Sequence, residues 1–399
     1  MMEKLFYKNQ YIKDFTANII EIKELDNKFH VVLDKTAFFP GGGGQFCDLG
    51  KIDNIEVEDV YEENKKIYHV LNNKPENTVV NASINWNRRE DGMHQHFAQH
   101  VLSGCFYRKY NANTTGFHLG KEFSTVDIKG YLSEEQIREV EKYANEVISQ
   151  DIPLTILTPS KDELKDIWIR RDLPDTDDEI RIVRIGDLDT NACCGVHPKS
   201  TKELRLIKIK RWEKNRQSTR IEFLAGKRAI DYTLRRDAYL SDICKYLKSK
   251  EDEALNGVVN LNDKIDELKN TIKKLENTVL NYQLEEIINN AYKINDLLVV
   301  EKIFENENVK YINKLANKLI ENENTIALLG VKNKDKINLV FASSSNIKNI
   351  NMNDLLKEVL NKINGKGGGN NHLAQGSIRY TDNIRIYIKN VIENIKDLL

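Results

Sequence analysis

Two pairs of side chains with metal-binding chemistry stand out in a chain that holds only 8 histidines and 5 cysteines. His96 and His100 are four residues apart, and Cys193 and His197 have the same spacing in a later segment. On a helix, residues i and i+4 project from one face, so both histidines can bind a single ion. Three imidazoles and one thiolate make a tetrahedral set that suits Zn²⁺. We therefore predict one zinc site. The alternative is a chance pair of histidines and a cysteine pair buried in the core.

The residues next to His96 argue against one class of zinc enzyme. A zinc metalloprotease helix carries a glutamate directly after its first histidine, where it acts as general base. Phe97 holds that position here, which argues against a protease. His94 is two residues from His96 and faces another side of the helix, so we expect it to be exposed.

The elements that must position these pairs follow from hydrophobic patterning. A helix over about 92–107 carries the two histidines. Ser133 and Gln136 have the capping-box spacing that opens a second helix, which ends near Gln150. Upstream, short β-type runs separated by turn residues predict a small antiparallel barrel or sandwich. These runs lie at 19–22, 30–33, 55–60, 67–70 and 79–84.

A glycine-rich loop, Gly41 to Gly44 followed by Gln45, interrupts the predicted strands. Glycines permit positive φ and close backbone approach, so this loop could hold a phosphate or a terminal ribose. It is not a P-loop, because no Gly-Lys-Ser/Thr follows. The alternative is a flexible hairpin loop, which the motif taken alone favours.

The chain becomes basic after the second ligand pair. Between Leu204 and Arg220 the acidic residue is Glu213, and Trp212 lies among the cations. The cations are Arg205, Lys208, Lys210, Arg211, Lys214, Arg216 and Arg220. Such a strand suits a phosphate backbone held over a nearby metal, although a solvated strand face would show the same pattern.

Length and composition set the outer limits. The 399 residues allow two or three domains, and a net charge of −1 means that any nucleic-acid footprint must be local. The sequence shows no apolar run near the ~18 residues of a membrane span and no secretory pattern at its start. The five cysteines do not have the spacing of a disulfide-bonded framework, and a thiolate ligand needs a reducing compartment. We expect a cytoplasmic protein without membrane contact.

Six motifs in sequence order resemble those of the alanyl-tRNA editing proteins, free-standing relatives of the editing domain of alanyl-tRNA synthetase. The motifs, within roughly the first 230 residues, are 41–45, Arg88-Arg89, the His96/His100 helix, 116–120, 193–197 and 220–226. The resemblance implies a zinc-dependent hydrolase that removes mischarged serine or glycine from tRNA(Ala). It makes the two ligand pairs the zinc ligands.

The resemblance also implies roles around the metal. His118 is expected to take part in catalysis. The residues expected to bind the substrate are Thr115, Gly43, Gly44 and Gln45. The sequence departs from the family pattern at Phe97, Val196 and Phe46, where Thr or Ser, Thr, and Pro are usual. No ligand is lost, but the missing hydroxyls leave open which amino acid is accepted.

The second half resembles the longer members of this group. Over 231–292 the chain reads as helical, and its apolar residues step by four and three, which predicts a coiled coil of about three heptads. The stripe consists of Leu261, Ile265, Leu268, Ile272, Leu275, Val279 and Tyr282. It can pack within the chain or against a second copy, so a homodimer through the C-terminal half is one of two open interpretations.

From about Asn295, strands alternate with helices at 312–321 and 352–363, which suggests an α/β domain. Its segment 365–376 resembles the glycine-rich signature of the DHH-associated domain found in alanyl-tRNA synthetases and certain phosphoesterases. The sequence has no Asp-His-His motif, so the resemblance implies nucleic-acid binding rather than phosphoester cleavage. A flexible surface loop is the alternative. Across both halves, the residues expected to bind nucleic acid are Arg205, Lys208, Lys210, Arg220, Lys366, Gly367, Gly368, Gly369 and His372.

These observations predict a multidomain α+β protein. The parts are a β-barrel domain at 1–86, a zinc-bearing α+β editing core at 87–230, a helical coiled-coil linker at 231–292 and an α/β DHH-associated-like domain at 293–399. The expected activity is trans-editing, in which Zn²⁺ assists hydrolysis of the aminoacyl ester of mischarged tRNA(Ala). Two alternatives stay open. One is a non-catalytic tRNA-binding protein with structural zinc, because four protein ligands is the count of a closed zinc site. The other is editing of a different aminoacyl-tRNA.

Overall fold

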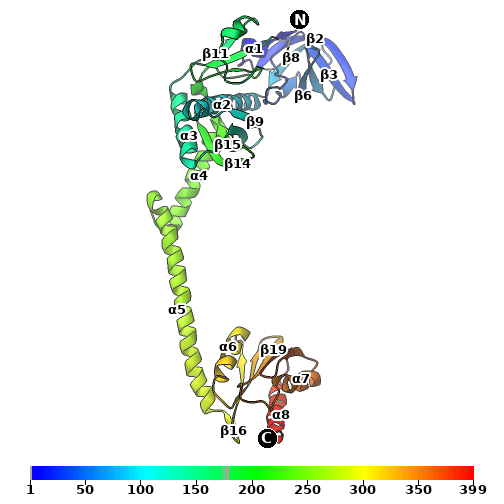
Figure 1. The fold of residues 1–399 in the computed structure, drawn as a ribbon. Coiled ribbons are helices and arrows are strands. Elements are labelled where there is room, and N and C mark those ends of the chain that lie inside the picture. Colours follow the sequence, from blue (N-terminus) through cyan, green and yellow to red (C-terminus); the bar gives the residue numbers. More distant parts are fainter. Residues whose placement is uncertain (1, 174–175, 177–178) are drawn as a thin grey trace. The chain divides into compact units, whose positions relative to one another are not determined.

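The computed structural model describes residues 2–173, 176 and 179–399, and the chain divides into two compact units between Glu251 and Asp252. The first unit holds antiparallel sheets with helices packed beside them, and the second holds a long helix and a mixed sheet (Figure 1). The mixed α+β class predicted from the sequence is confirmed. None of the helices in the described part of the chain is long and apolar enough to cross a membrane.

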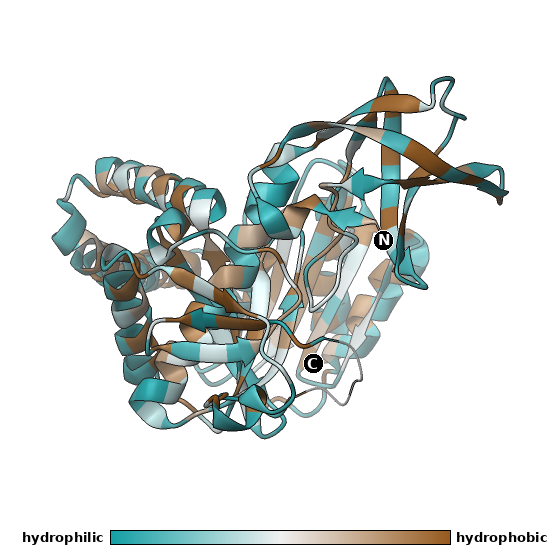
Figure 2. Cartoon of the chain, turned by 90° about the horizontal axis from the view of Figure 1, so that it is seen from above, coloured by the Kyte–Doolittle hydropathy of each residue, from teal (hydrophilic) through white to brown (hydrophobic). Residues whose placement is uncertain are grey.

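The first unit opens with a closed antiparallel barrel. Around it the strands follow the order β2 (Asp14–Leu25), β3 (Lys28–Leu33), β7 (Lys66–Leu71), β6 (Ile55–Glu63), β5 (Gly50–Ile52) and β8 (Val79–Ile84). Hydrophobic and hydrophilic residues follow one another along these strands (Figure 2), because successive side chains point to opposite faces. Val31, Leu33 and Ile67 are fully buried in the barrel core. Beside the barrel, β1 (Glu3–Lys4) pairs with β4 (Lys35–Thr36) and leads into the one-turn helix α1 (Leu5–Lys8).

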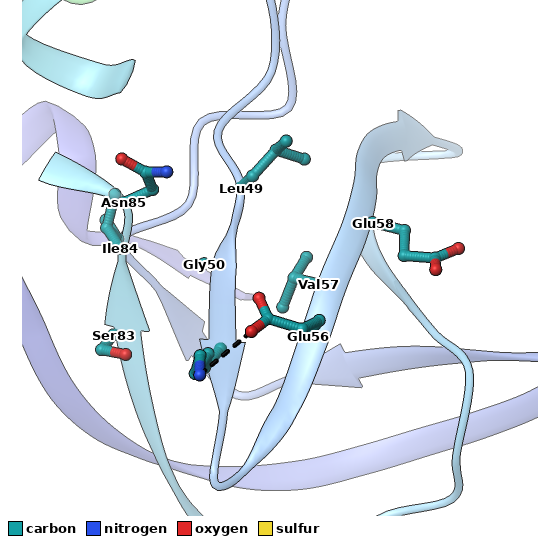
Figure 3. Close-up of a pocket in the computed structure, with 9 residues that line it drawn as sticks. Leu49, Gly50, Glu56, Val57, Glu58, Ser83, Ile84 and Asn85 are labelled. Atoms are coloured by element: carbon teal, nitrogen blue, oxygen red, sulfur yellow. Dashed lines mark ion pairs between the residues drawn. The ribbon is translucent and has the colours of Figure 1, made fainter. Parts of the chain in front are cut away.

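An open cavity of about 550 Å³ lies on the barrel between β5, β6 and β8 (Figure 3). Its charged residues are one lysine and two glutamates, and Lys51 is paired with Glu56 at 3.0 Å. The second glutamate, Glu58, is paired with Lys28 at 2.6 Å, so the one cation and both carboxylates of the lining are already neutralised. The lining therefore offers no unpaired cation to a phosphate backbone.

Helix α2 (Trp86–Tyr110) runs through the middle of the first unit. The side chain of Asn85 caps its start by accepting a hydrogen bond from the amide of Arg88 at 3.2 Å. The helix extends beyond the predicted range at both ends, and all its residues from Gly92 to Phe106 are buried. The prediction that His94 is exposed is therefore wrong. His94 is only 4% exposed, because the backbone of Gly226 packs onto its ring.

Two sheets and two helices surround α2. The four-stranded antiparallel sheet has the order β14 (Ile207–Asn215), β15 (Ser218–Ala225), β10 (Ser124–Lys129) and β9 (Thr114–Leu119). The three-stranded sheet is β11 (Leu154–Leu157), β12 (Ile182–Ile185) and β13 (Asp189–Ala192), with 3₁₀ turns η1 (Glu163–Asp166) and η2 (Thr201–Leu204) nearby in sequence. Helix α3 (Glu134–Ser149) begins with the predicted capping box of Ser133 and Gln136. Helix α4 (Gly226–Leu247) follows β15, and a short turn η3 (Glu251–Glu253) spans the boundary between the units.

The second unit begins with the long helix α5 (Ala254–Asn289). Near its end, Leu280 and Ile287 are buried in a core shared with α6 and β17. The predicted apolar stripe is present but uncovered: Leu268 is 54% exposed and Ile272 55%.

A six-stranded sheet forms the rest of the second unit. Its order is β16 (Tyr292–Ile294), β17 (Leu297–Glu305), β18 (Thr325–Lys332), β19 (Lys336–Ser343), β21 (Leu373–Arg379) and β20 (Lys366–Gly369). The pair β17–β18 is parallel, and helix α6 (Val309–Leu319) connects its strands, whereas the other pairs are antiparallel. Helices α7 (Met352–Lys362) and α8 (Ile384–Asp397) share one core with the sheet, and α5 and α6 share a second core with it. The α/β architecture predicted for this region is confirmed.

Candidate metal centre

Four side chains converge inside the first unit within reach of a single ion. One ligand-type atom from each of His96, His100, Cys193 and His197 lies within 4.8 Å of the others. Nε2 of His96 is 3.0 Å from Sγ of Cys193, and Nε2 of His197 is 3.5 Å from the same sulfur. All three histidines are buried. The tertiary fold thus brings together two pairs that lie far apart in the sequence.

Helix α2 and the loop after β13 each supply one pair. One helical turn separates His96 from His100, and their ring centroids are 5.3 Å apart. Arg181, directly before β12, holds the loop in place. Its carbonyl accepts a hydrogen bond from the amide of Cys193 at 2.9 Å, and its guanidinium donates to the carbonyls of Cys193 and Gly195 at 3.0 Å each.

The donor set fits a divalent ion such as zinc. Nε2 of His100 is buried and has no hydrogen-bond partner among the described residues, an arrangement that is costly unless something binds the nitrogen. Burial alone would raise the pKa of the Cys193 thiol, but the adjacent His96, His197 and His100 hold that pKa well below 9.0. The thiolate is the form that binds a metal. The chemistry of the four donors therefore supports a metal centre.

A buried carboxylate stands behind the ligands. Nδ1 of His100 donates to Oδ2 of Asp189 at 3.1 Å, and Nε of Arg170 donates to Oδ1 of Asp189 at 2.6 Å. Burial acts to raise the pKa of Asp189, yet His100 and Arg170 keep that pKa below 3.8. Sequence reasoning missed Asp189 and Arg170, because their spacing from the ligand pairs matches no motif. The one available signal was an acidic residue at the start of the strand that precedes Cys193.

The glycine-rich loop is built against the metal centre. A Cβ on Gly43 would lie 3.0 Å from Sγ of Cys194 and 3.9 Å from Cε1 of His96, and φ of Gly43 is 58°. The side chain of Gln45 is buried, and its Oε1 accepts a hydrogen bond from the amide of Val196 at 3.0 Å. Gly44 packs closely on the ring of Phe117. The structure therefore brings Gly43, Gly44 and Gln45 to the centre.

His118 lies on the side of β9 that faces away from the ligands, and Thr115 lies at an irregularity in the pairing of β9 with β10, where other groups hold its side chain. The ring of Phe117 is 5.6 Å from that of His96, and alternation along the strand turns His118 to the opposite face, where it is exposed. Oγ1 of Thr115 donates to the carbonyl of Asp127 at 3.2 Å and lies 3.0 Å from Oγ of Ser218. The structure does not bring these two side chains to the four ligand atoms.

The basic segment contains both paired and unpaired cations. Lys208 pairs with Glu141 at 3.0 Å, and Arg220 pairs with Asp127 at 2.8 Å. Lys210 instead lies over an aromatic ring, with Nζ 4.8 Å from the centroid of Phe123. An existing carboxylate partner reduces what a cation offers to a phosphate.

Other residues named for nucleic-acid binding occupy exposed backbone positions. Arg205 follows η2 in the left-handed region, with φ of 58°. In the second unit, Lys366 to Gly369 form the exposed edge strand β20, where the amide of Gly369 donates to Oδ1 of Asn353 at 3.0 Å. Nδ1 of His372 lies 3.2 Å from Oγ of Ser343. Their role toward nucleic acid stays a prediction.

Known proteins and family models match both units of the chain. The model described as threonyl and alanyl tRNA synthetase second additional domain matches residues 180–222, and the DHHA1 domain matches residues 295–397. The alanyl-tRNA editing protein AlaX-L of Pyrococcus horikoshii is 31% identical over 395 residues, which cover 95% of each chain. An alanine–tRNA ligase of Methanobrevibacter smithii is 30% identical over 392 residues, which are 94% of this chain and 43% of the ligase. The solved C-Ala domain from Aquifex aeolicus alanyl-tRNA synthetase covers 27% of this chain and 96% of its own, with 23% sequence identity and a TM-score of 0.24.

Proposed function

Because this chain belongs to the alanyl-tRNA editing protein family, we propose that its metal centre serves hydrolysis of the ester between a wrong amino acid and tRNA(Ala). The observation that carries the proposal is the convergence of His96, His100, Cys193 and His197 beside the glycine-rich loop. In the reaction, water adds to the acyl carbon, and the ribose oxygen leaves with a proton. The products are the free amino acid and intact tRNA.

We assign zinc to the site from its donors, three imidazoles and a thiolate. When bound, Zn²⁺ supplies Lewis-acid polarisation of the ester carbonyl or lowers the pKa of a water toward ~7. The protein holds the donors in fixed orientations. Asp189 orients His100, and Arg181 fixes the loop that carries Cys193. A thiolate ligand needs a reducing compartment, which supports a cytoplasmic location.

The glycine-rich loop is our candidate for holding the terminal ribose. Gly43 has no side chain to fill the space beside Cys194 and His96, so a substrate can approach its backbone closely. Gln45 is buried and bound to the amide of Val196. We therefore assign Gln45 a positioning role, in which it keeps this loop against the segment that carries Cys193 and His197.

Serine or glycine is the amino acid that we propose for removal. Phe97 and Val196 are both buried and present apolar groups near the centre, with the Phe97 ring centroid 6.0 Å from that of His197. Recognition of a serine hydroxyl therefore needs a polar group from elsewhere, because a buried hydroxyl without a partner is costly. The backbone of Gly43 and Gly44 is our candidate for that group.

Two neighbouring cysteines offer a matched test. Cys193 is one of the four ligands, whereas Cys194 is exposed and outside that set. We would charge tRNA(Ala) with serine, glycine or alanine, and measure ester loss and bound zinc for wild type, Cys193→Ala and Cys194→Ala. We expect the wild type to hydrolyse the serine or glycine ester and to spare alanine, and Cys194→Ala to bind zinc as the wild type does. Cys193→Ala should lose both zinc and activity.

Other outcomes of this test would contradict parts of the proposal. Full activity in a zinc-free Cys193→Ala protein would exclude a metal role. A wild type that binds zinc but causes no ester loss under any of the three chargings would favour a non-catalytic tRNA-binding protein with a structural zinc. If none of the three esters is lost, other charged tRNAs would be assayed in the same way, and hydrolysis of one of them would mean that the substrate is not tRNA(Ala).

The second unit supports two further assignments. We propose that edge strand β20 contributes to RNA binding, because Lys366 and the adjacent glycines are exposed and leave the backbone open to phosphates.

We also propose a second copy of the chain as the partner of the α5 stripe. The exposed stripe residues Leu268 and Ile272 repeat at the a/d spacing that pairs helices.

A further inference from the structure

We propose that a groove on the first unit, between α4 and the β9–β10 loop, binds the single-stranded RNA that adjoins the aminoacyl end of the substrate. The groove has a volume of about 590 Å³, and its lining holds five cations and two carboxylates. It contains none of the four metal ligands. This inference rests on the proposed function, because that function supplies the RNA.

Much of the positive charge in the groove is not neutralised. Of the two carboxylates, Asp231 is paired with Lys227 at 2.6 Å, whereas Glu122 has no ion pair among the described residues. Of the five cations, Arg228 is paired with Asp91 from helix α2. Three more cations of the lining have no ion pair with any carboxylate in the described part of the chain. They are Lys121, Arg235 and Arg236. Lys210 adds a further charge that rests on aromatic rings. A polyanion would therefore meet unpaired cations on two sides of the groove.

Aromatic rings interleave with these cations on one helix face. Tyr232, Arg235, Arg236 and Tyr239 follow the i, i+3, i+4, i+7 spacing of a single stripe on α4. Tyr239 is 67% exposed. Nζ of Lys210 and Cζ of Arg236 lie 5.8 Å and 5.6 Å from the centroid of Tyr232. Cations for phosphates beside rings for base stacking are the two components that bind single-stranded nucleic acid.

The groove is connected to the helix that carries the metal ligands. The guanidinium of Arg228 donates to the carbonyl of Gly120 at 2.8 Å and pairs with Asp91 on α2. Gln95, the neighbour of His96, exchanges hydrogen bonds of 2.9 Å and 3.0 Å with the backbone of Ala225. The start of α4 is thus held to α2 beside the metal centre. Nucleotides next to an ester at that centre would be placed near the groove.

The test uses the full chain and two probes. One is a fluorescently labelled single-stranded oligoribonucleotide, whose affinity is measured over a range of salt concentrations. The other is the seryl ester of adenosine, which carries the scissile ester but no phosphate. The variants are Arg235→Ala with Arg236→Ala, Tyr239→Ala, and Tyr239→Phe as the variant that keeps the ring. Lys74→Ala, an exposed cation in the barrel loop after β7, is the control for loss of charge.

We expect the double arginine variant to bind the RNA at least about tenfold more weakly. The slope of log affinity against log salt concentration should fall in magnitude by about 0.7 for each phosphate that the variant no longer neutralises. Tyr239→Ala should bind about 5- to 150-fold more weakly, whereas Tyr239→Phe should bind like wild type. Lys74→Ala should change nothing. Every variant should hydrolyse the seryl ester of adenosine as the wild type does.

Several results would overturn this assignment. Wild-type RNA affinity in the double arginine variant would exclude the groove as the RNA-binding site. If the groove variants lost hydrolysis of the seryl ester of adenosine as much as they lost RNA binding, the role of these residues would be structural. The groove would be a general polyanion site if inorganic polyphosphate bound as tightly as the RNA and if Tyr239→Ala did not weaken RNA binding. Absence of ester hydrolysis by the wild type would refute the proposed function alone, because the RNA-binding comparison would still report on the groove.

Discussion

The carboxylate of Asp189 lies 3.1 Å from Nδ1 of His100, on the opposite side of the ring from the nitrogen that faces the metal centre. Arg170 holds the same carboxylate from behind at 2.6 Å. A hydrogen bond of this kind fixes which imidazole nitrogen is free to bind a metal and in which direction it points. The orientation of His100 therefore depends on two residues that do not belong to the ligand pairs.

Asp189→Asn should lower the zinc affinity by about 10- to 100-fold, because the amide holds the His100 ring more weakly and no longer raises its basicity. Zinc affinity would be measured by competition with a chelator. Asp187→Asn, an exposed change in the turn before β13, is the matched control and should bind zinc normally. An unchanged affinity in Asp189→Asn, with the fold intact, would show that His100 does not need this carboxylate.

His118→Ala should raise KM for aminoacylated tRNA and leave kcat for the seryl ester of adenosine unchanged. The reason is its exposed position on the face of β9 opposite to Phe117, which favours contact with RNA over contact with the ester. Steady-state kinetics on both substrates would separate the two roles. Loss of hydrolysis of the small ester would instead support the catalytic role that the family resemblance implies.

His69 should make the first unit sensitive to acid. Its ring is fully buried, with Nδ1 2.9 Å from the carbonyl of Val31 and Nε2 2.8 Å from Oγ1 of Thr36. Burial lowers the pKa of His69 from 6.5 to about 4, so the unfolded chain binds a proton more readily than the folded one. Stability from neutral His69 is present above pH 6.5 and is lost as the pH falls toward 4, by about 3 kcal/mol in total.

Urea unfolding at several pH values tests this expectation. All three tryptophans, Trp86, Trp168 and Trp212, belong to the first unit, so their fluorescence reports on that unit alone. The advantage in unfolding free energy of wild type over His69→Gln should shrink between pH 7 and pH 4. A difference independent of pH would mean that His69 does not titrate in this range.

Gly226→Ala should destabilise the first unit more than Gly130→Ala. Both glycines have positive φ, 58° and 93°, so both substitutions strain the backbone by about 1–2 kcal/mol. Only at Gly226 does the new Cβ overlap the ring of His94, whereas nothing lies within 4 Å at Gly130. The overlap should add about 1–3 kcal/mol. Tryptophan-monitored unfolding would measure both, and equal losses would mean that the His94 ring moves aside without cost.

Ile272→Asp should convert an assembled form of the protein to a monomer, because a charge in an a/d stripe cannot be buried against a second helix. Asn270→Asp adds the same charge off the stripe and should leave the assembly intact. Light scattering coupled to gel filtration gives the mass of each. If the wild type is a monomer at all concentrations, a second copy of the chain is not the partner of the exposed α5 stripe.

The sequence by itself indicated two local pairs of candidate metal ligands. The i, i+4 spacing places His96 and His100 on one helix face, and Cys193 and His197 lie close together within one short segment. The barrel-type strands and the α5 stripe could be predicted because each repeats at a period set by its own backbone, and the capping box because Ser133 and Gln136 are three residues apart. The resemblance to editing proteins, carried by six short motifs, was confirmed by a relative that covers 95% of both chains.

Only the tertiary structure decided which distant groups meet. The two ligand pairs join because β13 ends beside α2. Asp189, on the same strand, contacts His100, and Arg170 binds Asp189. His94 is buried because Gly226, far along the chain, packs on its ring, and a local pattern cannot report such a contact. Strand alternation and the side of β9 that meets α2 placed His118 away from the ligands, since a shift of one residue would reverse that face.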